Sequence, residues 1–301
     1  MNKKVLFIVN PKSGKEQIKT KLLEIVDLFV KNKMDLTIYT TQRSQDACEV
    51  TRNRIAEFDM IVCSGGDGTL DEVITGMMQS KIKKPLGYIP GGSTNDFAHS
   101  LKIPKNLVAA AGVITLNRQY LCDIGGFNED YFVYIAAFGL FTDVSYQTSQ
   151  QLKNILGHVA YVLEGAKRIF NIKAYKMSIE IEGEMVTEEF IYGMVTNSES
   201  VGGFRNMTGK NVKLNDGLFE VTLIKSPKNP IELQEIIGAL LLQEVNPKYM
   251  YSFKTDRLII ESEDEVPWTL DGEFGGNHRQ LEIVNHKQAI PIMVKSLDAL
   301  K

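Results

Sequence analysis

The 301-residue chain has few cysteines, no long apolar run and no excess of basic residues. Its three cysteines, Cys48, Cys63 and Cys122, are too few and too scattered for a disulfide framework, and no pair of them has metal-ligand spacing. No apolar stretch reaches the roughly 20 residues that span a bilayer, and Pro11 interrupts the N-terminal residues too early for a secretory signal. We therefore expect a cytoplasmic protein without a transmembrane segment, which touches a membrane only at its surface.

The charges of the chain are nearly balanced. Lys and Arg number 34 and Asp and Glu number 37, so the net charge is −3. This balance lacks the positive field of a general nucleic-acid binder. The four histidines form no His-Glu-x-x-His pattern, and no Gly-x-Ser-x-Gly elbow marks a hydrolase. The length suggests two domains or one large one.

Short apolar runs alternate with amphipathic stretches over residues 1–125. This alternation is typical of an α/β domain, whose sheet is mostly parallel and has helices on both faces. The predicted strands are 5–9, 36–39, 60–63 and 86–89, and the predicted helices are 16–30, 46–58, 70–78, 95–101 and 107–116.

Residues 126–301 are richer in predicted strands. The pattern favours an antiparallel β-rich sandwich, with the boundary near Gly125 and Gly126 and with the last residues of the chain as candidates to return to the first domain. The predicted strands are 131–138, 175–181, 190–195, 218–224, 258–260, 268–270, 281–284 and 290–294, and the predicted helices are 152–170 and 231–242.

Three polar, glycine-rich loops follow three predicted strands of the first domain, at residues 10–15, 64–69 and 90–96. In an open α/β sheet, loops after the strands gather at one edge, where ligands bind. Glycine lets the main chain approach a ligand, and helix N-termini present N–H groups to phosphate. Taken singly, each loop is explained equally well as a strand-to-helix turn with a capping side chain.

Neither standard phosphate fingerprint is present. In the Walker A register, Gly14-Lys15 is followed by Glu16, and Val9 occupies the position of the first glycine. The Gly-x-Gly-x-x-Gly pattern does not follow the first predicted strand. The loops alone therefore indicate a phosphate ligand such as a nucleotide, with Asp67 as a candidate for holding Mg²⁺.

Five motifs in order resemble the diacylglycerol kinase catalytic family, which includes sphingosine and ceramide kinases, and in particular its soluble bacterial branch of lipid kinases. The resemblance covers nearly the whole chain. Its motifs are Asn10-Pro11-x-Ser13-Gly14-Lys15, Gly65-Gly66-Asp67-Gly68-Thr69, Pro90-x-Gly92-x-Thr94-Asn95-Asp96-Phe97, Leu214-Asn215-Asp216-Gly217-Leu218 and Leu270-Asp271-Gly272-Glu273.

The resemblance implies roles for the matching residues. Asp67 acts through Mg²⁺ on the phosphates of ATP, Glu273 is the general base that takes the proton of the lipid hydroxyl, and three further residues hold a structural metal. The metal residues are Lys213, Asp216 and Leu218. The residues of the nucleotide site and its polar network are Asn10, Pro11, Lys12, Ser13, Gly14, Lys15, Thr41, Gly66, Asp67, Gly68, Thr69, Thr94, Asn95, Asp96 and Asp123.

The carboxylates also have structural explanations. Asp216-Gly217 is a common turn pair, and Asp271-Gly272 is a hairpin candidate. Residues two apart in an extended segment point to the same face, so the pattern does not choose between Asp271 and Glu273 as the base. The resemblance chooses Glu273.

The predicted activity is ATP-dependent phosphorylation of the hydroxyl of diacylglycerol or a similar lipid at the membrane surface, a step of phospholipid biosynthesis. The sequence does not decide between a monomer and a homodimer. Two residues depart from the family pattern: His99 stands where many bacterial members have Arg, and Glu164 where this branch often has Lys. The alternatives are a kinase of a soluble dinucleotide, similar to NAD kinases, and a non-catalytic nucleotide or lipid sensor on the same fold.

Overall fold

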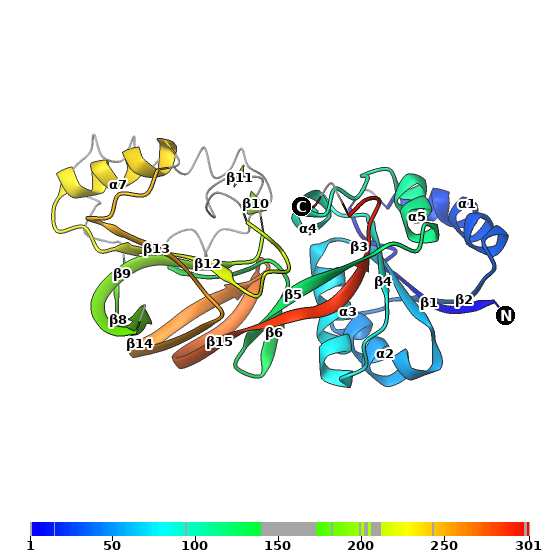
Figure 1. The fold of residues 1–301 in the computed structure, drawn as a ribbon, viewed down its shortest axis with the longest axis horizontal. Coiled ribbons are helices and arrows are strands. Elements are labelled where there is room, and N and C mark those ends of the chain that lie inside the picture. Colours follow the sequence, from blue (N-terminus) through cyan, green and yellow to red (C-terminus); the bar gives the residue numbers. More distant parts are fainter. Residues whose placement is uncertain are drawn as a thin grey trace. The chain divides into compact units, whose positions relative to one another are not determined.

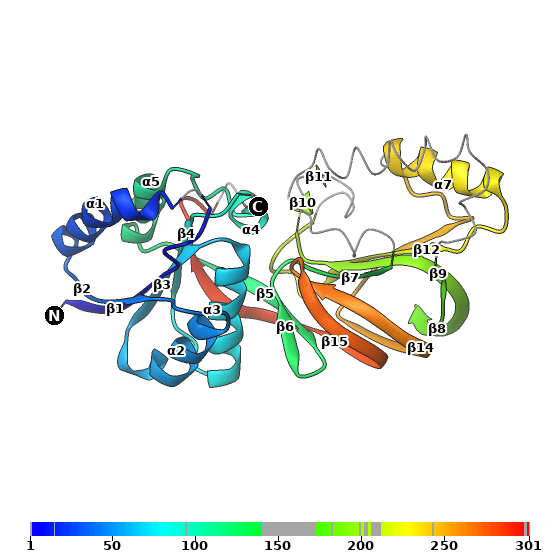
Figure 2. The same ribbon diagram turned by 180° about the vertical axis from the view of Figure 1, so that it is seen from behind.

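The computed structural model describes residues 2–14, 16–93, 95–139, 173–181, 183–198, 200–201, 204–205, 212–242, 244–297 and 300. The chain divides into two compact units (Figures 1 and 2). The first unit contains Met1–Ile124, Lys213–Gly217 and His286–Lys301, and the second contains Gly125–Val212 and Leu218–Asn285. The chain therefore enters the first unit three times.

The sheet of the first unit has the strand order β15-β4-β3-β1-β2. The C-terminal part of β15 pairs with β4, next to the three strands that follow it in this order, and all four neighbouring pairs are parallel. Burial explains this arrangement, because every residue of β3 and β4 is buried, as in strands covered on both faces. The strands are β1 (Lys3–Val9), β2 (Met34–Thr40), β3 (Met60–Gly65), β4 (Leu86–Pro90) and β15 (Glu273–Met293).

Helices lie on both faces of this sheet (Figure 1). Helix α1 (Ile18–Lys31) packs against α5 (Leu107–Thr115), and α2 (Asp46–Arg54) packs against α3 (Asp67–Ser80). A short 3-10 helix, Ile55–Glu57, extends α2, and α4 (Asp96–Ser100) follows β4. These elements confirm the predicted alternation of strands and helices.

The second unit is built on antiparallel pairs, in the order β13-β12-β9-β7-β14-β15 with β8 against both β9 and β14. Counted over the described chain, most strand pairs are antiparallel, and the parallel pairs belong to the first unit. The elements are β5 (Gln119–Phe127), β6 (Asp130–Phe132), β7 (Ile135–Gly139), β8 (Tyr175–Ile181), β9 (Glu184–Thr196), β10 (Ser200–Val201), β11 (Phe204–Arg205), β12 (Phe219–Lys225), α7 (Pro230–Leu242), β13 (Met250–Thr255) and β14 (Arg257–Leu270).

Aromatic side chains form the core of the second unit. Trp268, the single tryptophan of the chain, packs between Phe138 and Phe127, with ring centroids 4.8 and 5.3 Å apart. Phe132 stacks near Phe219 at 5.5 Å. Aromatic pairs of this kind stabilise a fold by roughly 0.5–1.5 kcal/mol beyond the area they bury.

Two predicted strand pairs turn out to be single long strands. Strand β14 contains the predicted strands 258–260 and 268–270, and β15 contains the predicted strand 281–284 and all but the last residue of 290–294. Between the two predicted parts of β14, the β14–β15 register shifts at Glu261/Val266, where exposed polar residues interrupt the apolar pattern.

The predicted helix at 152–170 lies outside the described residues. Among the described residues, no helix is long and apolar enough to cross a bilayer.

Candidate active site

Four loops leave the carboxyl ends of neighbouring strands in the first unit. The N–H of Asn10 donates to the carbonyl of Ser64 (2.8 Å), the N–H of Gly91 donates to the carbonyl of Gly65 (2.7 Å), and the N–H of Thr41 donates to the carbonyl of Val9 (3.0 Å). These bonds extend the sheet by one step beyond β1, β2 and β4. The structure therefore brings the three predicted glycine-rich loops and Thr41 to one edge.

Glycine is required where the loops approach one another. A Cβ atom on Gly14 would lie 2.1 Å from the carbonyl oxygen of Gly91, and a Cβ on Gly92 would lie 2.7 Å from the Cα of Gly66. Gly14 also has φ +55°, in the left-handed region that side chains disfavour. The loops thus form a close-packed main-chain surface.

Asparagine side chains fix the shape of this surface. The Asn10 amide donates to the Thr69 hydroxyl (2.9 Å), and its carbonyl accepts the N–H of Lys12 (3.0 Å). Asn95, in the left-handed region at φ 54°, accepts the N–H of Gly92 (2.9 Å) and donates back to its carbonyl (2.7 Å). The Asn95 side-chain oxygen also accepts the Tyr88 hydroxyl of β4 (3.3 Å), so the Asn95 amide holds its own loop and ties that loop to the strand before it.

Asp67 is the first residue of α3 and follows Gly66, which caps the helix without a side-chain hydrogen bond. One Asp67 oxygen accepts the N–H of Asp96 at 3.2 Å, which links α3 to the start of α4. Free N–H groups at the start of a helix attract phosphate. Main-chain N–H groups and hydroxyls at this edge could donate hydrogen bonds to a nucleotide phosphate, and the Asp67 carboxylate could ligate Mg²⁺. The edge therefore fits a nucleotide phosphate with Mg²⁺.

No group of three or more His, Cys, Asp or Glu side chains in the described part of the chain could hold a metal ion by itself. A cation at Asp67 would therefore need oxygens from the nucleotide, as Mg²⁺ at phosphates commonly does. Two residues of the predicted nucleotide site, Lys15 and Thr94, lie outside the described residues.

Asp271 and Glu273 stand at a two-residue hairpin turn of the second unit, in which Leu270 pairs with Glu273. Asp271 is 7% exposed, and its carboxylate accepts the N–H groups of Val133, Tyr134 and Ile135 at 2.6, 3.0 and 2.9 Å. Glu273 is exposed. The two carboxylates that sequence pattern leaves equivalent therefore have different surroundings: Asp271 braces the turn, and Glu273 faces solvent.

Asp123 is buried at a junction of three chain segments in the first unit. One carboxylate oxygen accepts the N–H of Gly217 (2.6 Å), the other accepts the N–H of Gln288 (2.7 Å), and the Asp123 N–H donates to the carbonyl of Leu214 (2.8 Å). Burial raises the pKa of Asp123, and the two N–H bonds oppose that rise. These contacts hold the turn that carries Lys213 and Asp216.

Some residues at these sites have no signal in the sequence. Gln288, with φ 51°, donates its side-chain amide to the carbonyl of Asn215 (3.3 Å), and nothing in its neighbourhood predicts this long-range contact. Residues Val133 to Ile135, whose main-chain N–H groups bind Asp271, also lie outside the five sequence motifs. Of the two departures from the family pattern, His99 lies on α4, and Glu164 lies outside the described residues.

Comparison with known proteins identifies both parts of the chain. The family described as "Diacylglycerol kinase catalytic domain" matches residues 4–126. The family described as "YegS C-terminal NAD kinase beta sandwich-like domain" matches residues 137–294.

Relatives match over nearly the full length. The diacylglycerol kinase of Bacillus subtilis (strain 168) is 32% identical over 276 residues, which cover 91% of each chain. The diacylglycerol kinase of Staphylococcus aureus (strain MRSA252) is 34% identical over 279 residues, 92% of this chain and 88% of that one. A solved structure of a putative diacylglycerol kinase from Bacillus anthracis str. Sterne superimposes with a TM-score of 0.79 at 28% identity and covers 99% of both chains. The chain therefore belongs to the diacylglycerol kinase catalytic family and is a kinase.

Proposed function

We propose that this protein transfers the γ-phosphoryl group of ATP to the hydroxyl of diacylglycerol or a similar lipid at a membrane surface, with Mg²⁺. The observation that carries the nucleotide half of this proposal is the edge at which the loops after β1, β3 and β4 pack main chain against main chain, beside the start of α3. Such an edge binds phosphate through N–H groups that need no rearrangement.

At the nucleotide, Asn10 to Gly14, Gly66 to Thr69 and Thr41 would bind and orient the phosphates and the nucleoside. Asp67 would hold Mg²⁺, which supplies charge neutralisation at the phosphates when bound. Asn95 and Asp96 act one step away, because they fix the 90–96 loop and contact Asp67. Lys15 and Thr94 complete the proposed set.

At the acceptor, Glu273 would take the proton of the lipid hydroxyl. Asp271 supports this role by holding the turn through three N–H bonds, while Glu273 keeps an exposed carboxylate. The next residue, Phe274, is 71% exposed. An apolar ring beside the proposed base suits a substrate that lies at a bilayer surface.

The turn that carries Lys213, Asp216 and Leu218 would supply oxygens to a structural metal, the two outer residues through their carbonyls. Hard oxygen ligands of this kind suit Mg²⁺. Asp123 and Gln288 would then keep the turn in place through their hydrogen bonds to Gly217 and Asn215 and to each other.

The experiment is a radiolabelled ATP assay of the full chain against purified lipids in mixed micelles, with NAD as the soluble competitor substrate. We expect label in phosphatidic acid from diacylglycerol. Label in NADP without lipid would establish the dinucleotide alternative instead. ATP binding without turnover on any lipid of the panel would establish the sensor alternative.

Asp67→Ala is the matched variant for this assay. We expect it to abolish transfer while the melting temperature falls by no more than a few degrees, because Asp67 is the first residue of α3 and is only partly buried, so little packing is lost. A large fall in melting temperature would make Asp67 a structural residue and contradict the proposed role.

A further inference from the structure

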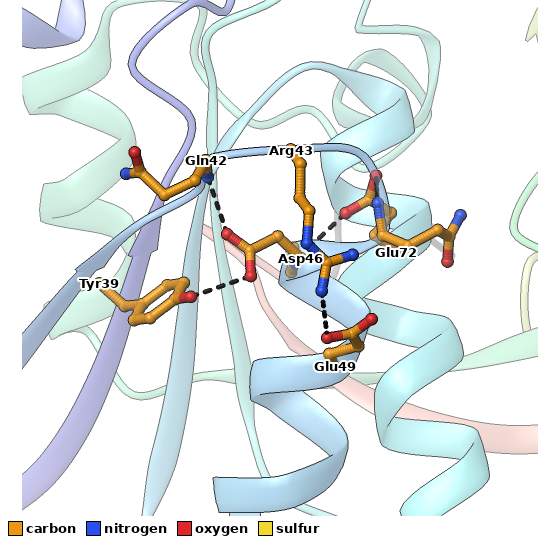
Figure 3. A network of polar contacts seen from close by, with 8 residues as sticks. Tyr39, Gln42, Arg43, Asp46, Glu49 and Glu72 are labelled. Atoms are coloured by element: carbon orange, nitrogen blue, oxygen red, sulfur yellow. Dashed lines mark hydrogen bonds and ion pairs between the residues drawn. The ribbon is translucent and has the colours of Figure 1, made fainter.

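The loop that joins β2 to α2, residues 41–45, is held by two carboxylates that no sequence motif indicates (Figure 3). The loop begins at Thr41, whose N–H donates to the carbonyl of Val9 at the end of β1. It therefore leaves the same sheet edge as the glycine-rich loops, directly beside Asn10. The loop therefore contributes Thr41 to this edge.

Asp46 holds the first half of the loop. It is 6% exposed, and its two oxygens accept from the Tyr39 hydroxyl at 2.9 Å and from the N–H of Gln42 at 2.7 Å. Tyr39 is a residue of β2, so Asp46 ties the start of α2 back to the strand that precedes the loop. The hydrogen bond to Asp46 raises the pKa of Tyr39.

Glu72 holds the second half. Its oxygens accept the N–H of Gln45 at 2.9 Å and the N–H of Ala47 at 3.1 Å. Gln45 has φ 65° and precedes α2 without a side-chain capping bond. A residue other than glycine in the left-handed region costs on the order of 1 kcal/mol and persists only where its surroundings impose it. Glu72 supplies that constraint, and Figure 3 shows its carboxylate at the loop.

Glu72 belongs to α3, the helix that begins with Asp67. One rigid helix therefore carries both the proposed Mg²⁺ ligand and the group that fixes the neighbouring loop. We propose that Glu72, with Asp46, is a positioning residue for the nucleotide: it sets the place of Thr41 relative to the start of α3, and so sets the affinity for ATP. This inference rests on the proposed nucleotide site and assigns Glu72 no contact with the nucleotide.

Glu72→Gln tests the role. The amide keeps one accepting oxygen but turns an NH₂ group toward a main-chain N–H, so one of the two bonds is lost at nearly constant shape. Removing one such bond corresponds to about 3- to 10-fold in an equilibrium constant. We expect the Kd of ATP, measured by calorimetry on the full chain without lipid, to rise by that factor. The KM for ATP should rise in parallel, while kcat at saturating ATP and the KM for lipid stay within about twofold.

Glu49→Gln is the control. Glu49 lies on α2 and pairs with Arg43 of the same loop at 2.7 Å, but both side chains are exposed. Exposed ion pairs contribute little. This variant should bind ATP like the wild type. An equal loss of affinity in both variants would mean that any charge change near the loop has this effect, and would overturn the assignment.

A double-mutant cycle with Thr41→Ala separates positioning from general damage. If Glu72 acts through Thr41, the double variant should bind ATP no more weakly than the worse single variant. Fully additive losses would overturn the inference, as would wild-type affinity in Glu72→Gln. If wild-type protein and Asp67→Ala bind ATP equally in the presence of Mg²⁺, the proposed nucleotide site is wrong, and that outcome is distinct from a failure of the Glu72 role alone.

Discussion

Asp271 and Glu273 show how one turn assigns different tasks to similar side chains. The Asp271 carboxylate is engaged by three main-chain N–H groups, and the Tyr134 hydroxyl donates to the Asp271 carbonyl at 3.0 Å. A carboxylate with this many donors is committed to structure. Glu273, one residue beyond Gly272, carries no comparable constraint and is exposed. The two residues therefore predict opposite phenotypes.

We expect Glu273→Gln to lower kcat by at least about 100-fold with nearly unchanged ATP binding, because the amide has the same shape but cannot take a proton, and a general base contributes roughly 10²–10⁴ in rate. Steady-state kinetics on diacylglycerol micelles measure kcat, and calorimetry measures ATP binding. The melting temperature should stay at the wild-type value because the side chain is exposed. Retention of most of the turnover would show that the base lies elsewhere.

Asp271→Asn should have the reverse effect, with a lower melting temperature and a smaller loss of kcat than Glu273→Gln. An amide offers one accepting oxygen to three N–H donors, and each donor left unpaired in a buried site costs about 1–3 kcal/mol. A loss of about 2 kcal/mol corresponds to a fall of about 4–8 °C for a unit of this size. Differential scanning calorimetry measures it. If Asp271→Asn melted like the wild type but had a lower kcat than Glu273→Gln, Asp271 would be the base and Glu273 would not.

The helices and strands were largely predictable from the sequence, but the points at which strands continue or break were not. Strands β1 to β4 and helices α1 to α5 follow apolar periodicity, so their positions agree with the structure to within a few residues, whereas β5 has no counterpart among the predicted strands. The prediction divides β14 and β15 each in two, because partly exposed polar stretches interrupt the apolar pattern without ending the strand. The predicted strand 131–138 is broken into β6 and β7 because Asp271 takes the N–H groups of Val133 and Tyr134.

The loops of the first unit predict a test at Gly14. In Gly14→Ala, the new Cβ would lie 2.1 Å from the Gly91 carbonyl oxygen in a residue with φ +55°, so the 10–15 loop must move away from the 90–96 loop. We expect the KM for ATP to rise by about tenfold or more, as for a loss of 1–3 kcal/mol from local strain. The KM for the lipid should not change.

Gly112→Ala is the matched control for Gly14→Ala. Gly112 lies in α5, and a Cβ at this position meets no atom within 4 Å. Alanine favours a helix over glycine by about 1 kcal/mol, so this variant should be at least as stable as the wild type and fully active. If Gly14→Ala and Gly112→Ala had the same KM for ATP, the close approach of the loops would have no part in nucleotide binding.

The whole molecule is organised by contacts between segments that are distant in the sequence. Asp123, the 213–217 turn and Gln288 meet in the first unit, although about 165 residues separate the outer two. The sequence pattern around Asp216-Gly217 predicts a turn, but it does not indicate that this turn belongs to the first unit. Long-range hydrogen bonds produce no periodic pattern in the sequence. The contacts of Asp123 with Gly217 and Gln288 could therefore not be predicted.

We expect Mg²⁺ to raise the melting temperature of the full chain relative to chelator, and Asp216→Ala to abolish that difference. Metal bound to the folded protein stabilises it by mass action, by about 2.7 kcal/mol at a concentration 100 times the Kd. Calorimetry with and without Mg²⁺, in the absence of ATP, measures the shift. Equal melting temperatures for the wild type in both conditions would remove the structural metal from the proposal.

The pairing of β15 with β4 sets the order in which a nascent chain can mature. Ile292 pairs with Leu86, so the partner of β4 leaves the ribosome about 200 residues after β4 itself. At roughly 5–20 residues per second, β4 waits about 10–40 s with an unpaired edge, and an open strand edge invites pairing with other chains. The segments of the second unit have all been synthesised by Asn285, before His286 to Lys301 appear. The half of the protein that is translated first is therefore the half that is completed last.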